Sequence, residues 1–181
     1  MRAMARMLLA IYTVLIVVTI ALQIVFDAPV SALFAPSPQG LVEVDFALGL
    51  GVGLALVQLS QWAAGRVPAF RDMSDALGEI LRPLNHKDVF AQAFFSALAE
   101  ELFFRGFLQP RLGLHVTSLL FGFVHFPRDR RLRIWQPLGI VLGYLLGWMF
   151  ETRGSIVAPF LTHFAVNYFN MHFVLARRET A

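Results

Sequence analysis

The 181-residue sequence contains no cysteine and few charged residues. Because cysteine is absent, disulfide bonds, thiolate zinc sites and cysteine nucleophiles are all excluded. Charged residues make up 15% of the chain and hydrophobic residues 57%, whereas about 25% of the residues of a soluble domain are charged. The composition therefore predicts an integral membrane protein in contact with the lipid bilayer. The net charge of only +3 argues against a nucleic-acid partner.

Six apolar segments are candidates for membrane-spanning helices. They comprise residues 7–26, 46–62, 89–108, 112–126, 134–150 and 156–175. The first could be a cleaved signal peptide, but the apolar core of a signal peptide is shorter, about 7 to 15 residues, so we expect a retained helix. Segment 112–126 is only about 22 Å long, which fits a short span or a re-entrant helix. We expect residues 1–181 to form one all-α domain, a polytopic membrane bundle of about six transmembrane helices without strands.

Loops and one surface helix are expected between these segments. Residues 27–45 contain three prolines and a glycine but no Lys or Arg, which is typical of a loop. Within the polar residues 63–88, residues 73–84 are expected to lie in the membrane interface as a helix. The third membrane helix is expected to end before Pro110.

The basic residues divide unequally between the two sides of a six-helix topology. Twelve Lys and Arg residues fall on the side of both chain ends, and Arg105, Arg111 and Arg153 fall on the other. The positive-inside rule therefore places both termini in the cytoplasm, and we expect the membrane to be a bacterial inner membrane. The same division favours a full span for residues 112–126.

Glycines spaced four residues apart predict close contacts between helices. Gly49 and Gly53 lie on one face of the second segment, and Gly139, Gly143 and Gly147 form a stripe along the fifth. Both faces are expected to pack against neighbouring helices.

Three charged residues, Glu100, Glu101 and Arg105, lie inside the third apolar segment. A charge near the middle of a membrane helix costs about 2.5 to 3.5 kcal/mol, and function usually accounts for it. Glu101 and Arg105 are four residues apart on one helical face, so they are predicted to pair. Glu100 is turned away by about 100° and remains available for chemistry. The pair itself fits a structural brace as well as a supporting role in catalysis.

Two later segments add polar residues to the same apolar bundle. His125 lies near the end of the fourth segment, and His163 and Asn167 lie one turn apart on the sixth. Taken singly, such residues more often satisfy a backbone carbonyl or join helices than perform chemistry. Together with Glu100 they could supply a general base and donors for an oxyanion. The remaining histidines, expected at interfaces or in packing roles, are His86, His115 and His172.

The series Glu100-Glu101-x-x-x-Arg105, Phe121-x-x-x-His125 and His163-x-x-x-Asn167 on successive helices resembles the CPBP family of CAAX proteases and bacteriocin-processing enzymes. These are glutamic-type intramembrane endopeptidases. The similarity covers a core of about residues 88–170. The short chain is also similar in size to bacterial members called myxosortases, which are thought to cut C-terminal sorting signals.

The resemblance implies hydrolysis of a peptide bond near the C terminus or membrane anchor of a membrane-associated protein or peptide substrate. By similarity, Glu100 deprotonates the attacking water with the help of His125, and His163 and Asn167 hold the oxyanion. No metal or other cofactor is expected. The expected supporting residues are Glu101 and Arg105.

Two alternatives remain open from the residues alone. His125, His163 and a glutamate could be the ligands of a zinc metalloprotease, although the chain has no His-Glu-x-x-His helix and Asn167 would then have no obvious role. In a non-enzymatic transporter or scaffold, the same groups would form an ion path or a brace. Against a transporter, the segments show no inverted repeat.

Overall fold

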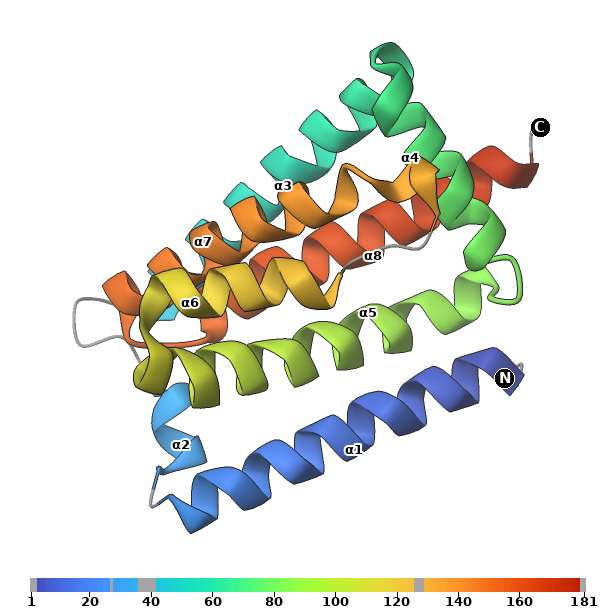
Figure 1. Cartoon of the computed structure of the whole chain (residues 1–181). Coiled ribbons are helices and arrows are strands. Elements are labelled where there is room, and N and C mark those ends of the chain that lie inside the picture. The colour runs from blue at the N-terminus through green and yellow to red at the C-terminus, as the bar shows by residue number, and fades with distance from the viewer. Residues whose placement is uncertain (1–2, 27, 36–41, 126–128, 180–181) are drawn as a thin grey trace.

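The computed structural model describes residues 3–26, 28–35, 42–125 and 129–179, and over these ranges it is all-α, with no strand. Figure 1 shows the arrangement of the helices. In chain order they are α1 (Ala3–Val25), α2 (Val30–Leu33), α3 (Val42–Arg66), α4 (Pro68–Ile80), α5 (His86–Glu101), the π-helix η1 (Leu102–Leu108), α6 (Gln109–Val124), the 3₁₀ helix η2 (Arg130–Leu132), α7 (Trp135–Arg153) and α8 (Val157–Glu179).

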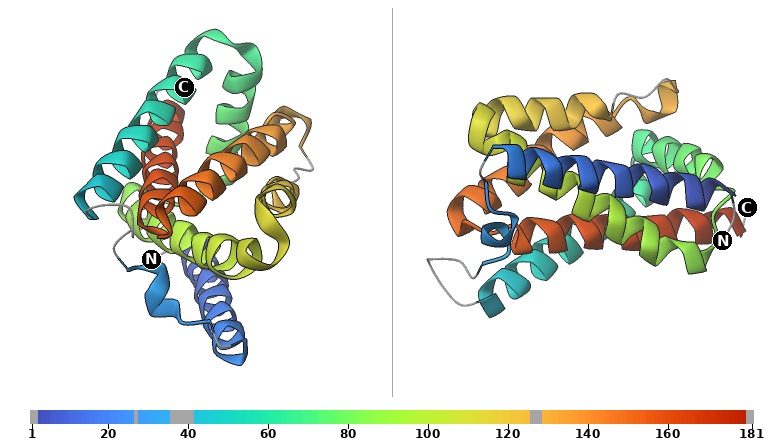
Figure 2. Two further views of the ribbon diagram at one scale, coloured as in Figure 1. Left: turned by 90° about the vertical axis from the view of Figure 1, so that its left-hand side faces the viewer. Right: turned by 90° about the horizontal axis from the view of Figure 1, so that it is seen from below.

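Helix α8 lies in the middle of the bundle and contacts α3, α4, α5 and α7. Helix α1 lies at the edge, against α5 and η1, and α6 packs on α7. Helix α1 begins and α8 ends at the same end of the bundle, as Figure 1 and the right-hand view of Figure 2 show. This arrangement agrees with the expectation that both termini lie on one side.

Helices α1 and α3 are long and apolar enough to cross a membrane. Large apolar side chains on α1, such as Val14 and Ile24, are more than half exposed, as expected for a helix that faces lipid. The number of spans stays a prediction.

The contacts predicted from the glycine spacings are confirmed. A Cβ atom at Gly53 would lie 2.8 Å from the Cβ of Ala165, so α3 approaches α8 as closely as a glycine allows. On α7, a Cβ atom at Gly143 would lie 3.0 Å from the carbonyl oxygen of Ser118 on α6. Glycine removes the side chain that would separate these backbones.

Helix α5 begins with a capping box. The Asn85 side chain accepts hydrogen bonds from the backbone N–H groups of Lys87 at 2.9 Å and Asp88 at 3.1 Å. In return, an Asp88 carboxylate oxygen accepts a bond from the Asn85 N–H at 3.4 Å. These bonds satisfy N–H groups that have no partner within a helix, and they fix where the helix carrying the two glutamates begins.

The expected end of the third helix before Pro110 is wrong. The chain continues from α5 through η1 into α6, and it reverses only at Gly113, where φ is 76° and ψ is 169°. Pro110 lies at the junction of η1 and α6, and the backbone before it is already helical, with φ of −77° and ψ of −48° at Leu108. Residues 114–124 then form a helix of only about 16 Å, so the fourth segment is shorter than expected and this helix by itself cannot cross a 30 Å core.

Two further boundaries differ from the expectation. The surface helix is α4, Pro68–Ile80, which begins five residues before the predicted start because Pro68 is a favourable first residue. The short helix α2 lies within the predicted loop 27–45.

Candidate active site

Glu100 and Glu101 are the last two residues of α5, and the π-helix η1 begins at the next residue. A π-helix is rare, and most examples occur at functional sites, where the extra residue in a turn changes the direction of the side chains that follow. Arg105 lies inside η1. The π-helix was not predicted from the sequence, because residues 89–108 form one continuous and largely apolar segment that fits an ordinary α-helix.

Each carboxylate oxygen of Glu101 lies close to a nitrogen of another side chain. Its Oε2 lies 3.2 Å from Arg105 Nε, and both side chains are completely buried. This is the predicted ion pair. In addition, Glu101 Oε1 accepts a hydrogen bond from His163 Nδ1 at 2.8 Å, a contact between α5 and α8 that the spacing within one helix could not indicate.

Arg105 is held by neighbours on α6 and α7 as well. Its Nη2 donates to the carbonyl oxygen of Gly143 at 3.3 Å, and its guanidinium lies 4.8 Å from the ring centroid of Phe121. An aromatic face and a carbonyl both favour a cation. Glu101 and Arg105 therefore connect α5 and η1 with three other helices of the bundle.

Glu100 lies in a different environment. Its Oε2 is 3.7 Å from His125 Nε2 and 3.9 Å from His163 Nε2, and the side chain retains 17% exposure. Both distances exceed a direct hydrogen bond, and this oxygen accepts none from the described residues. Polar atoms at such separations can be bridged by a water molecule.

The hydrogen-bond partners determine which ring nitrogen of each histidine carries a proton. His125 Nδ1 lies 2.6 Å from the carbonyl oxygen of Phe121, which can only accept, so Nδ1 must donate. His163 Nδ1 likewise donates to the carboxylate of Glu101. In the neutral rings, both Nε2 atoms are then acceptors directed toward Glu100.

Asn167 extends the site by one turn of α8. Its Nδ2 donates to Ser96 Oγ at 3.0 Å. Ser96 lies on α5 one turn before Glu100, and its hydroxyl donates to the carbonyl oxygen of Ala93. The structure thus brings His125 and His163 within 4 Å of one carboxylate oxygen of Glu100. It also holds Asn167 against α5, the helix that carries Glu100.

The roles of Ser96 and Gly143 in holding Asn167 and Arg105 were missed from the sequence, because both contacts are made across helices. Phe121, which belongs to the motif that contains His125, accepts the hydrogen bond of that histidine. The ring of Trp135 lies 5.7 Å from that of His125.

The other histidines make contacts of their own. His115 bonds the hydroxyl of Tyr144 at 3.2 Å. His86 and His172 stack with ring centroids 4.9 Å apart. These contacts agree with packing or interface roles.

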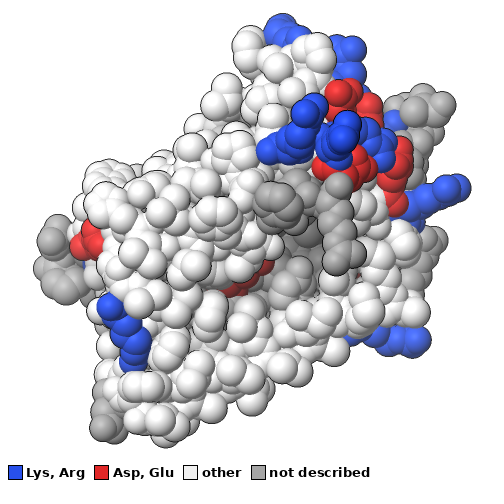
Figure 3. Space-filling view, viewed as in Figure 1, with Lys and Arg blue, Asp and Glu red and all other residues white. Residues whose placement is uncertain are grey.

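The surface above the site is hollowed. Figure 3 shows a depression in the middle of one face, with acidic atoms at its floor and most Lys and Arg near the ends of the molecule. Glu100 is partly exposed, whereas Glu101 is fully buried. Within the part of the chain that the structure describes, no cluster of three or more His, Cys, Asp or Glu side chains is arranged to hold a metal ion.

A salt-bridge cluster joins η2 to α4. Arg131 in η2 donates to both carboxylate oxygens of Glu79 on α4, at 2.9 and 2.7 Å, and also to Asp129. These hydrogen bonds lower the pKa of the Glu79 and Asp129 carboxyl groups. Asp129 is also the N-cap of η2.

Comparisons with known proteins found a family match that spans the residues of this site. Residues 84–169 match the family described as Type II CAAX prenyl endopeptidase Rce1-like. The chain is also 40% identical over 73 residues to the uncharacterized protein YpbD of Bacillus subtilis (strain 168). That alignment covers 39% of this chain and 37% of YpbD, so the chain spans little more than a third of this relative. No solved structure matches the chain significantly.

Proposed function

Because residues 84–169 are a domain of the Rce1-like type II CAAX prenyl endopeptidase family, we propose that this protein hydrolyses peptide bonds inside the membrane with a water molecule activated by Glu100. Membership of the family implies membrane protease activity. The substrate would be a membrane-associated protein or peptide, cut near its C terminus or membrane anchor.

The observation that carries the proposal is the convergence of His125 and His163 on one oxygen of Glu100, at 3.7 and 3.9 Å. A water molecule held between these groups would donate one proton to the carboxylate while its oxygen attacks the scissile carbonyl. The C–N bond then breaks as the proton passes to the leaving amine. His125 would orient the water through its Nε2, because its Nδ1 is committed to Phe121.

The oxyanion of the tetrahedral intermediate would be held by His163 and Asn167. His163 Nδ1–H already donates to Glu101, so Nε2 can donate to the oxyanion only when the ring carries a second proton. The carboxylate of Glu101, 2.8 Å from Nδ1, would stabilise the charge on that ring. Donors aimed at developing charge in a dry site are worth far more than in water. Glu101 would thus take part in catalysis through His163 while also pairing with Arg105.

A zinc metalloprotease is the second candidate because two imidazole nitrogens and a carboxylate oxygen are a known catalytic zinc set, although the described residues include no such cluster arranged to hold a metal ion. Dialysis of the purified protein against a strong chelator distinguishes the two. Retained cleavage is expected for water activated by Glu100. Loss of cleavage that returns with stoichiometric zinc would favour the metalloprotease.

The decisive experiment is co-expression with candidate membrane-anchored substrates, followed by identification of the new chain ends by mass spectrometry. The candidates are prenylated C-terminal tails, bacteriocin leaders and C-terminal sorting segments. The control variants are Glu100→Gln, expected to be inactive, and Glu43→Gln, an exposed glutamate on α3 that should leave cleavage unchanged. Equal cleavage by wild type and Glu100→Gln would refute the proposal.

A further inference from the structure

Helix α1 lies outside the part of the chain that matches the family, yet it turns polar side chains inward. Thr19 and Gln23 are buried almost completely, and Gln92 on α5 donates to the carbonyl oxygen of Ala5 at 2.9 Å. Ala5, Tyr12 and Thr19 are spaced by seven residues, which places them on one face of the helix. This face therefore packs along α5 and η1.

Gln23 is unusual on that face because its amide group has no acceptor. The side chain is 1% exposed, and its Nε2 makes no hydrogen bond with the described residues. It lies against η1, where a Cβ atom at Gly106 would be 2.9 Å from this nitrogen. A buried donor without a hydrogen-bond partner destabilises a protein. A ligand that offers an acceptor to Gln23 Nε2 would remove this cost.

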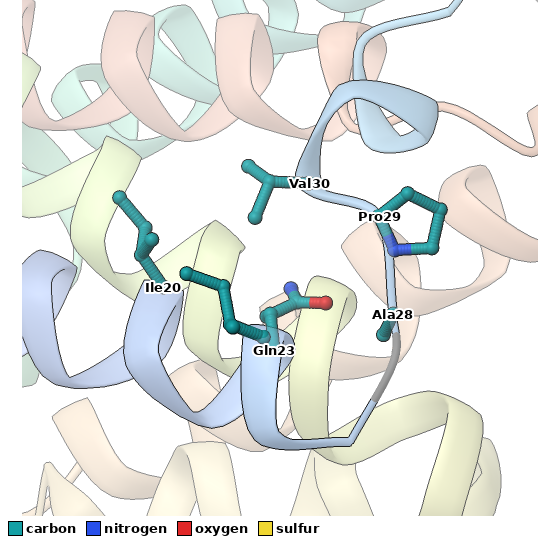
Figure 4. A pocket seen from close by; sticks show the side chains of 6 residues that line it. Ile20, Gln23, Ala28, Pro29 and Val30 are labelled. Carbon is teal, nitrogen blue, oxygen red and sulfur yellow. The ribbon is translucent and has the colours of Figure 1, made fainter.

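Gln23 lines an open cavity of about 550 Å³ together with Ile20, Ile24, Ala28, Pro29 and Val30. Figure 4 shows its amide between Ile20 and Pro29, beneath Val30. Among the described residues of the lining, Gln23 supplies the polar side-chain group and the other five are apolar. Such a site fits one carbonyl group carried by an apolar ligand.

The short distance between the cavity and Glu100 favours a peptide substrate as the ligand. Gly106, which contacts Gln23, follows Glu100 by six residues, or about 9 Å at most along the helix axis. An extended peptide covers that distance with about three residues. Helix α1 packs along both α5, which carries Glu100, and η1, which contacts Gln23, so this helix lies beside both sites.

We propose that the Gln23 cavity is a substrate subsite. In this subsite Gln23 Nε2 donates a hydrogen bond to a backbone carbonyl of the peptide, about three residues from the bond that is cut, and Ile20 and Val30 contact an apolar side chain. The inference rests on the proposed protease function and names part of its substrate: an extended segment with an apolar residue at that distance.

The first test measures stability and needs no substrate. Gln23→Leu removes a buried donor that has no partner, so the melting temperature in detergent should stay unchanged or rise. Gln92→Leu is the matched control, because Gln92 is equally buried but its Nε2 is bonded to Ala5; this variant should melt at a lower temperature. An equal fall in both variants would show that Gln23 is structural and would overturn the subsite.

The second test measures cleavage of the peptide identified by mass spectrometry and of versions shortened from either end. Gln23→Leu should lower kcat/KM about tenfold on the full peptide, the value of one hydrogen bond. It should match the wild type on a peptide too short to reach the cavity. Equal losses at every length, or no loss at any length, would overturn the proposal.

A third measurement separates peptide from lipid as the occupant. A photoreactive p-benzoylphenylalanine replaces Val30 in the Glu100→Gln variant, which should bind the peptide without cutting it. Cross-linking to the peptide supports the subsite, whereas cross-linking to lipid alone overturns it. If Glu100→Gln is inactive and Gln23→Leu is normal, the subsite fails while the protease function stands; an active Glu100→Gln variant refutes the function itself.

Discussion

Glu100 and Glu101, the last two residues of α5, face opposite kinds of environment. Their carboxylates differ in how completely neighbouring polar groups satisfy them. On the Glu101 side, one buried carboxylate contacts Arg105 and His163 at 3.2 and 2.8 Å. On the Glu100 side, the Nε2 atoms of His125 and His163 lie 3.7 and 3.9 Å from the carboxylate and the side chain stays partly exposed. Adjacent carboxylates can thus hold separate roles, because a turn of about 100° gives each its own neighbours.

The largest effect is expected from the less satisfied carboxylate. Glu100→Gln removes the proposed base while keeping size and burial, so cleavage should fall by a factor of about 10² to 10⁴. The melting temperature should change little, since among the described residues no ion pair of Glu100 is shorter than 3.7 Å. Rate and melting measurements on the same preparation check this, and normal cleavage would refute the division of roles.

The second largest effect should be on stability. Glu101→Gln leaves Arg105 fully buried without its counter-ion, a change that typically costs 3 to 5 kcal/mol. Replacing both residues by leucine should recover much of that loss, because no uncompensated charge then remains. A double-mutant cycle measured by unfolding in detergent gives the coupling between them. If Glu101→Gln is as stable as the wild type, the two sides do not differ as described.

A smaller effect is expected at Ser96, which holds Asn167. Ser96→Ala removes the acceptor of the 3.0 Å bond from Asn167 Nδ2, and we expect kcat to fall about five- to tenfold with KM nearly unchanged. Ser74→Ala on α4 is the matched control, since Ser74 bonds only the carbonyl oxygen of Phe70 among the described residues. Equal activities of the two variants would remove Ser96 from the positioning of the site.

Contacts within one helix were predictable from the sequence, and contacts between helices were not. The pairing of Glu101 with Arg105 and the shared face of His163 and Asn167 follow from a period of 3.6 residues. The hydrogen bond from His163 to Glu101 depends on how far α8 is displaced along α5, which packing decides. The all-α bundle and the glycine contacts could also be predicted, since both follow from local patterns, and the structure confirms them.

The errors have a physical cause as well. The π-helix η1 gives no sequence signal because its apolar residues suit an α-helix equally well. The prediction placed the end of the third helix before Pro110, yet the chain stays helical across this proline, where the π-helix η1 passes into α6. The reversal occurs at Gly113, where a positive φ favours glycine.

The smallest effect is expected away from both glutamates, at the cluster that Arg131 forms with Glu79 and Asp129. The hydrogen bonds of Arg131 lower the pKa of Glu79 and Asp129, so the stabilisation is complete above their ordinary range near pH 4 and is lost as the pH falls through the lowered values. Arg131→Gln should therefore lower the melting temperature by about 2 °C or less between pH 5 and 8, because exposed ion pairs contribute little. The difference from wild type should shrink below about pH 4.

Arg133→Gln is the control for that last measurement, since Arg133 bonds the carbonyl oxygen of Arg130, which does not titrate. Its effect on melting should be independent of pH over the same range. The Arg131 effect should also weaken in 1 M salt, where the Debye length is about 3 Å. Because His125 is held by Phe121 within its own helix, cleavage should change less than twofold in Arg131→Gln. A larger loss would show that the Arg131 cluster positions His125 and so contributes to the catalytic site.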